Sequence, residues 1–303
     1  MWRAAYRIPF WATVGEASLA PFRNFRTLAR FAWPWLLLLL VTEAALGWLF
    51  YPHKSAGAMF VAADVAASLL TMAVSLVLGS IVAVSWHRFL LLGEQPTADR
   101  SKAGVIGAYT LRSAVITLLV FAPLVVAGAV IAGIVDPAMF GADATAPGVD
   151  AETAVAAEAA AASEVGEVGE AASPWMCAVC VVLAIVVGLP IIALISYVPT
   201  RFSLALPATA LGSSERSFAA AWRLSRSNVW RLMWGGLLVS WPCFAYMAIS
   251  LALLDVEVAE TRGVYVGNAV GSAAVSFASG VLWVGFLSIA YRHLRAARSS
   301  APD

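Results

Sequence analysis

Charged residues are scarce in this chain of 303 residues, where Asp, Glu, Lys and Arg together make up only 12%. In soluble domains their share is nearer a quarter. Hydrophobic residues make up 61%, and the mean hydropathy is +0.84. So much apolar surface needs lipid as its solvent, which excludes an ordinary soluble domain. The sequence predicts an all-α polytopic membrane protein, since helices satisfy their own backbone groups in a bilayer.

Cysteine and histidine are also rare, and their positions argue against a catalytic, redox or metal site. Cys177 and Cys180 form a C-x-x-C pair, but zinc needs four ligands and no second pair or nearby histidine exists. We interpret them as small apolar residues rather than a redox or metal site. His53, His87 and His293 are scattered, and no phosphate-binding, dinucleotide-binding or nucleophile-elbow motif occurs. The sequence therefore predicts no catalytic residues, no metal, no cofactor and no nucleic-acid partner.

Long apolar runs predict six transmembrane helices, because roughly 20 apolar residues cross the hydrocarbon core. Pairing in chain order gives three hairpins, and each hairpin returns to one side with an aromatic residue followed by an arginine. This pattern is typical of an internal repeat, or simply of the anchoring that every inward exit needs. Prolines inside three of the spans predict kinks. The spans fall at about 31–51, 60–86, 105–135, 175–199, 229–254 and 264–291, and the kinks at Pro123, Pro190 and Pro242.

The basic residues decide the predicted orientation. Of the 19 lysines and arginines, 17 fall in segments that share one side, and only Lys54 and Arg262 fall on the other. The positive-inside rule places the first side, with both termini, in the cytoplasm of a bacterial inner membrane. The segment 136–173 carries eight acidic residues and no basic residue, and we interpret it as an outer, acidic, low-complexity loop. The predicted parts are a basic amphipathic segment (1–30), a six-helix domain (31–291) with a cytoplasmic basic elbow (200–228), and a basic tail (292–303).

The first segment and the elbow interleave arginines with aromatic residues. In the elbow, Phe218 and Trp222 are four residues apart and share a helical face, while arginines gather on another. Such helices suit the boundary between hydrocarbon and anionic headgroups. We therefore expect membrane phospholipid as a partner. The predicted headgroup-binding residues are Arg23, Arg26, Arg30, Arg88, Arg201, Arg216, Arg223 and Arg226.

Small residues recur every four positions in the second and sixth spans. They let helix backbones approach closely, either within the monomer or against a second copy or another membrane protein. The predicted packing positions are Thr71, Ser75, Gly79, Gly263, Gly267 and Gly271.

Three single polar residues have more than one interpretation. Glu43 lies near the middle of the first span, where an ionised carboxylate costs about 2.5–3.5 kcal/mol. It is either an intramembrane proton or cation relay or a neutral carboxyl bonded to a facing hydroxyl. His87, at an inner exit, is interpreted as an interfacial side chain, with contact to a lipid phosphate as the alternative. Asn228, just before the fifth span, is predicted to be a helix N-cap.

Two stretches carry a family resemblance. Arg201-Phe-Ser-Leu-Ala-Leu-Pro-Ala-Thr-Ala-Leu-Gly212, followed by Ala221-Trp-Arg-Leu-Ser-Arg-Ser-Asn228, is one, and Trp86-His-Arg-Phe-Leu-Leu-Leu-Gly-Glu94 is the other. Together they resemble six-span bacterial inner-membrane proteins without a settled activity, akin to the membrane domain attached to some glycerophosphoryl diester phosphodiesterases. The resemblance implies a helical bundle with a role near phospholipid. It carries over no catalysis, because that reaction belongs to a separate soluble barrel that this chain lacks.

Two functions follow as hypotheses. The first is a non-enzymatic accessory or scaffold protein in envelope or phospholipid homeostasis, which contacts anionic lipid through its basic elbows. The alternative is a small-solute or lipid transporter that uses Glu43. A water-filled, polar-lined cavity that reaches Glu43 would favour transport, whereas a filled core with lipid-facing stripes of small residues would favour the scaffold.

Overall fold

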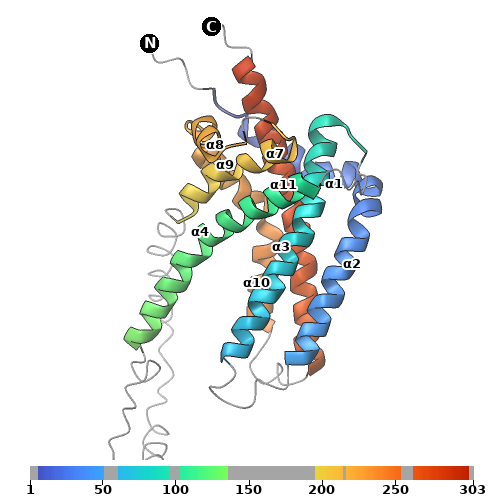
Figure 1. The fold of residues 1–303 in the computed structure, drawn as a ribbon, viewed down its shortest axis with the longest axis vertical. Helices are drawn as coiled ribbons and strands as arrows, with labels where there is room; N and C mark the ends of the chain where they lie inside the picture. Colours follow the sequence, from blue (N-terminus) through green and yellow to red (C-terminus); the bar gives the residue numbers. More distant parts are fainter. Residues whose placement is uncertain are drawn as a thin grey trace, which may run out of the picture. The chain divides into compact units, whose positions relative to one another are not determined.

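The structure, a computed structural model, describes residues 6–50, 61–95, 103–135, 195–213, 216–253 and 262–299. Within these ranges the chain forms helices and no strand, in agreement with the all-α prediction (Figure 1). Two compact units are present, one of Met1–Thr117 with Tyr197–Asp303 and one of Leu118–Ser196. The predicted acidic loop, most of the predicted fourth span, and Cys177 and Cys180 lie outside the described residues.

Several helices are long and apolar enough to cross a membrane. In the described ranges four qualify, within α2 (Phe25–Phe50), α3 (Val61–Leu92), α4 (Ala103–Val135) and α11 (Arg262–Ser299). A fifth candidate is a bent pair, α9 (Val229–Val239) and α10 (Trp241–Leu253). The chain is thus a helical membrane protein with four or five candidate spans among the described residues.

The predicted fifth span bends between α9 and α10. The two helices meet at Ser240 at an angle of 49°. Pro242 follows two residues later and has no backbone N–H, so it cannot donate a helical hydrogen bond to the Leu238 carbonyl. Proline in the first turn of the second helix is the position that a helix tolerates best. The proline therefore separates α9 from α10 without ending the apolar run.

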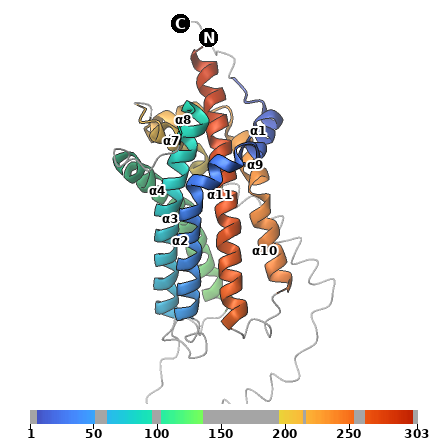
Figure 2. The same cartoon turned by 90° about the vertical axis from the view of Figure 1, so that its right-hand side faces the viewer.

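Helix α1 (Phe10–Arg23) lies across the end of the bundle, whereas α2 and α3 run along it (Figure 2). It buries a narrow face of small residues that includes Ala17 and Ala20, while Trp11 and Phe22 on other faces are about three-quarters exposed. The helix ends at Asn24, whose side-chain amide donates to the Ala20 carbonyl at 2.9 Å. The chain then turns into α2. This geometry is that of an interfacial helix joined directly to a span.

Asn228 differs from its prediction. It stands at the N-cap position of α9, but its side chain makes no capping hydrogen bond. Instead its Oδ1 accepts from the Ile8 amide at 2.8 Å and its Nδ2 donates to the Tyr6 carbonyl at 2.8 Å. The Arg231 guanidinium also donates to the Ile8 carbonyl. The buried amide therefore holds the segment before α1, where the amino acid sequence alone suggested a local cap.

The core is built around α11, which is the most buried of the candidate spans. Trp86 of α3 is fully buried and stacks on Phe89 at a ring separation of 5.4 Å. Short helix α7 (Ala205–Ala210) is buried along its whole length. Helix α8 (Phe218–Ser225) is capped by Ser217, which accepts from the Ala220 amide at 3.1 Å. Helices α1, α7 and α8 and the C-terminal ends of α3 and α11 gather at one end of the unit (Figures 1 and 2).

Candidate functional site

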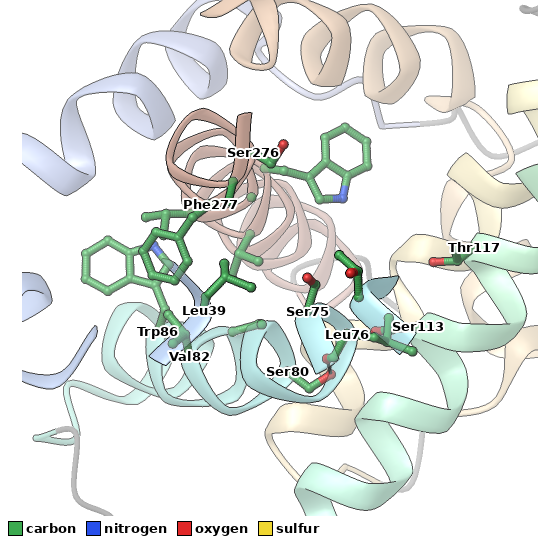
Figure 3. A pocket seen from close by; sticks show the side chains of 18 of the residues that line it. Leu39, Ser75, Leu76, Ser80, Val82, Trp86, Ser113, Thr117, Ser276 and Phe277 are labelled. Carbon is green, nitrogen blue, oxygen red and sulfur yellow. Dashed lines mark hydrogen bonds between the residues drawn. The ribbon is translucent and has the colours of Figure 1, made fainter. Parts of the chain in front are cut away.

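A cavity of about 670 Å³ lies among α2, α3, α11 and the first half of α4 (Figure 3). Its volume falls in the range of about 300–1,000 Å³ that small-molecule pockets occupy. Most of the wall is apolar, with residues such as Leu39, Val82 and Val284, and Leu206 is contributed by α7. The cavity therefore offers a small molecule a largely hydrophobic enclosure inside the spans.

Hydroxyl groups interrupt this wall on three helices. Figure 3 shows Ser75 and Ser80 on α3, Ser113 and Thr117 on α4, and Ser276 on α11 around the same space. The Ser80 hydroxyl donates to the Leu76 carbonyl at 2.6 Å, which leaves its oxygen as an acceptor. Hydroxyls bonded to their own helix can thus add polarity without breaking the helix. The full set lining the cavity is Thr71, Ser75, Ser80, Ser113, Thr117, Ser272 and Ser276.

Glu43 is the only acidic or basic side chain that the described part of the chain contributes to the wall. Leu39, Leu78 and Ala273 pack together and mark one level on α2, α3 and α11. Glu43 lies one turn beyond Leu39, towards the end of the bundle away from α1. On the other two helices, the same direction leads to the cavity hydroxyls of Thr71, Ser75 and Ser272. The carboxyl group and a group of hydroxyls therefore share one end of the cavity.

Aromatic side chains line the cavity towards the other end. They are Trp86, Tyr109, Phe277 and Trp283. Along α3, Thr71 and Trp86 are 15 residues apart, which corresponds to about 22 Å of helix. The indole N–H of Trp86 is buried and has no hydrogen-bond partner among the described residues. The cavity is thus elongated and amphipathic, with a polar end and an aromatic end.

His87 is not interfacial, which corrects the interpretation from the sequence. Its ring is fully buried, with Nδ1 2.7 Å from the Ser288 hydroxyl and Nε2 3.2 Å from the Tyr109 hydroxyl. The Ser288 hydroxyl donates its single proton to the Val284 carbonyl at 2.8 Å, so it must accept from Nδ1–H. The ring is therefore the Nδ1-protonated tautomer, and Nε2 accepts from Tyr109. His87 ties α3 to α4 and α11 behind the cavity.

Two of the arginines expected to bind headgroups are engaged inside the protein. Arg201 is 4% exposed and donates to the Trp222 carbonyl at 2.7 Å, the Tyr197 hydroxyl and the Ser225 hydroxyl. Arg88 makes a two-pronged ion pair with Glu94, at 2.7 and 2.8 Å, and donates to the Ala210 carbonyl. Their donors are directed at protein acceptors, so we no longer count Arg201 as a headgroup ligand. Arg88 has few donors left for a lipid headgroup.

The other six arginines of that set are exposed. They lie on α1 and the first turns of α2, and on and around α8, with the exposed aromatic residues Trp11, Phe22 and Phe25 beside the first group. Headgroup binding at these positions stays a prediction. The residues are Arg23, Arg26, Arg30, Arg216, Arg223 and Arg226.

The small residues predicted to pack helices lie in different surroundings. Thr71, Ser75 and Gly79 line the cavity, and a methyl group added to Gly79 would meet no described atom within 4 Å. A methyl group at Gly263 or Gly267 would likewise meet no described atom within 4 Å, whereas one at Gly271 would meet the Tyr246 side chain. The close helix approach that the sequence analysis missed is at Gly235 and Gly236, where a methyl group would overlap Phe286 and Trp283 respectively. The adjacent glycines inside an apolar run were the signal available for it.

The cavity hydroxyls of α4 and α11 were also missed. Ser113 and Thr117 are four residues apart, as are Ser272 and Ser276, and both pairs repeat the spacing noted on α3. Equal spacing on three spans was therefore available as a signal for one shared polar surface.

No group of three or more potential metal ligands occurs among the described residues. Cys243 in α10 is a free, half-buried thiol. Comparison with known proteins finds no matching family model, no matching curated protein and no matching solved structure. The resemblance noted from the sequence therefore remains an expectation, and the cavity is the feature from which function must be argued.

Proposed function

We propose that this protein is a transporter of the bacterial inner membrane that takes a small amphipathic solute into the cavity among α2, α3, α4 and α11. The single observation that carries the proposal is a cavity of about 670 Å³ whose largely apolar wall is interrupted by serine and threonine hydroxyls and reaches Glu43. A protein that only anchors or scaffolds others has no use for an intramembrane cavity with a carboxyl group, because both its empty volume and its polar groups cost stability. A transport site near the bilayer midplane needs both.

The wall chemistry supports an amphipathic solute. Most of the lining is aliphatic or aromatic, and the hydroxyls together with Glu43 supply a small number of polar contacts. Ligand pockets typically combine these two components, the first for affinity and the second for orientation. A strongly polar solute would leave its hydrogen bonds unmet against the apolar wall, so it is disfavoured.

Cavity-filling variants test the proposal. Gly79 and Gly280 line the cavity, and a side chain at either would meet no described atom within 4 Å at its first carbon. Leucine at these positions should therefore fill the cavity and leave the helices intact. Gly107 on α4 is equally open but does not line the cavity, so Gly107→Leu is the matched control.

The probe is the neutral dye N-phenyl-1-naphthylamine, whose fluorescence is measured with the protein in lipid nanodiscs. Empty nanodiscs give the background from dye in the lipid. We expect Gly79→Leu and Gly280→Leu to reduce the saturable signal at least tenfold and Gly107→Leu to leave it unchanged. Equal binding by all three variants would contradict the proposed site.

The proposal includes six spans in three hairpins, with both termini in the cytoplasm. It is supported by the gathering of the arginine-bearing elements α1, α8 and the end of α11 at one end of the unit (Figure 1). Arginines resist transfer across the bilayer, which makes that end the cytoplasmic one. A reporter fused after Asp303 that is active only in the cytoplasm is the expected result, and a periplasmic signal would overturn the orientation.

A second function, an accessory protein in envelope or phospholipid homeostasis, is favoured by the exposed arginines beside α1 and α8. Each cation near an anionic surface contributes about 1 kcal/mol. The triple variants R23Q/R26Q/R30Q and R216Q/R223Q/R226Q should therefore each lower the stabilisation of the detergent-solubilised protein by phosphatidylglycerol. Phosphatidylcholine serves as the neutral control. If both triple variants respond to phosphatidylglycerol like the native chain, the headgroup contact is wrong.

A further inference from the structure

We infer that the solute taken into this cavity is a lipophilic monocation, with the Glu43 carboxylate as its counter-ion. The inference deepens the proposed function and rests on it, because it names the class of molecule that the same cavity accepts. Three features of the cavity carry it: the sign of its charge, the position of that charge, and the aromatic wall.

The sign of the charge excludes anionic solutes. Among the described residues, Glu43 is the only acidic residue in the cavity lining, and no lysine, arginine or histidine of this part of the chain lines it. Two arginines adjoin lining residues along the chain: Arg88 pairs with Glu94, and Arg112 donates to the Ala108 carbonyl of its own helix. An anionic solute would meet a carboxyl group with no compensating cation, which is unfavourable inside a bilayer. A cation is the only charged solute whose entry gains from Glu43.

The carboxyl group lies where one end of an elongated solute would rest. Glu43 is at the same end as the hydroxyls of Thr71, Ser75 and Ser272, and Trp86 is about 22 Å from Thr71 along α3. The hydroxyl oxygens can accept hydrogen bonds from an ammonium group or surround a quaternary one. The apolar body of the solute then extends along the rest of the cavity.

The aromatic wall favours the same class. Trp86, Phe277 and Trp283 contribute rings to the lining, and Figure 3 shows Trp86 and Phe277 close together at one side of the cavity. A ring attracts a cation only within about 6 Å of its centre, so Trp86, about 22 Å from Thr71 along α3, does not reach a charge beside Glu43. The same rings bury the apolar body of a lipophilic cation. A neutral apolar solute would gain from the rings but not from Glu43.

The test uses two probes of the same shape and opposite charge. Tetraphenylphosphonium and tetraphenylborate are measured by equilibrium dialysis against the full chain in lipid nanodiscs, with empty nanodiscs as background. We expect saturable binding of the phosphonium and none of the borate. Glu43→Gln should reduce phosphonium affinity at least tenfold, while Glu16→Gln, which alters a carboxylate paired with Arg292 outside the cavity, should leave it unchanged.

The outcomes separate this inference from the proposed function. Phosphonium binding that is equal in the native chain and in Glu43→Gln, or equal binding of the borate, overturns the cation class. If the neutral naphthylamine dye still binds to the native chain and Gly280→Leu reduces that binding, the cavity remains a solute site with another specificity. If no probe binds in a saturable way, the proposed function falls together with the inference.

Discussion

The guanidinium carbon of Arg201 lies 3.7 Å from the centre of the Trp222 ring, and its Nη2 donates to the carbonyl of the same tryptophan at 2.7 Å. A second ring, that of Tyr197, lies 5.6 Å away. An arginine at the edge of a membrane domain is expected to face phosphate, yet this one is enclosed by aromatic groups and carbonyl oxygen. It fixes α8 against the helical stretch at residues 197–203.

Arg201→Lys should destabilise the fold although it keeps the charge. A lysine ammonium cannot stack flat on Trp222 while it also bonds to the carbonyl, since it lacks the planar fork of arginine. We expect a loss of about 1–3 kcal/mol, seen as a lower thermal unfolding midpoint in nanodiscs. Binding of phosphatidylglycerol should not change. Unaltered stability together with weaker lipid binding would return Arg201 to the headgroup set.

Tyr109→Phe and Ser288→Ala should each destabilise the protein by about 1–3 kcal/mol, because each leaves one nitrogen of the buried His87 ring without a partner. The double variant should cost less than the sum of the two, since the three side chains form one network. Thermal unfolding of all three variants gives the comparison. Strict additivity would mean that His87 does not couple the two hydroxyls.

Gly236→Ala should destabilise by about 1–3 kcal/mol through overpacking, because its new methyl group overlaps the Trp283 ring. Gly107→Ala, at an open position of α4, is the matched control and should be neutral or slightly stabilising. The thermal unfolding midpoint again reports the change. If the two alanine variants behave alike, α9 and α11 are not in the close contact described.

Asn228→Ala should free the segment before α1. It removes the acceptor for the Ile8 amide and the donor to the Tyr6 carbonyl, whereas Asn228→Asp removes only the donor. Hydrogen exchange at the Ile8 amide should therefore become much faster in the alanine variant and change less in the aspartate variant. Equal protection in the native chain and the alanine variant would show that Asn228 does not hold this segment.

The prediction from sequence was most accurate where it rested on transfer energy. The apolar runs behind α2, α3, α4, α9 with α10, and α11 are long enough to identify candidate spans without knowledge of their neighbours. It failed for polar side chains whose hydrogen-bond partners lie on another element. His87, Asn228 and Arg201 were all assigned to water, lipid or their own helix, and each is instead bonded to residues of another element.

The cavity shows the same division. Glu43 was singled out because a carboxyl group inside an apolar run is costly wherever that run packs. The hydroxyls elsewhere in the cavity wall, such as those of Ser113 and Ser276, cost little on any helix face, so nothing in the sequence marked them individually. Only the packing of three helices made them one surface.

The sequence by itself determined that this chain enters a membrane as helices, and it marked the arginine-rich and the arginine-poor segments. Those properties are sums over residues, fixed by the cost of placing each side chain in oil or water. Tertiary structure alone decided which arginines face outward, which glycines allow close contact, and that a cavity joins Glu43 to an aromatic wall. Those properties depend on distances between helices, and helix spacing depends on all contacting side chains together.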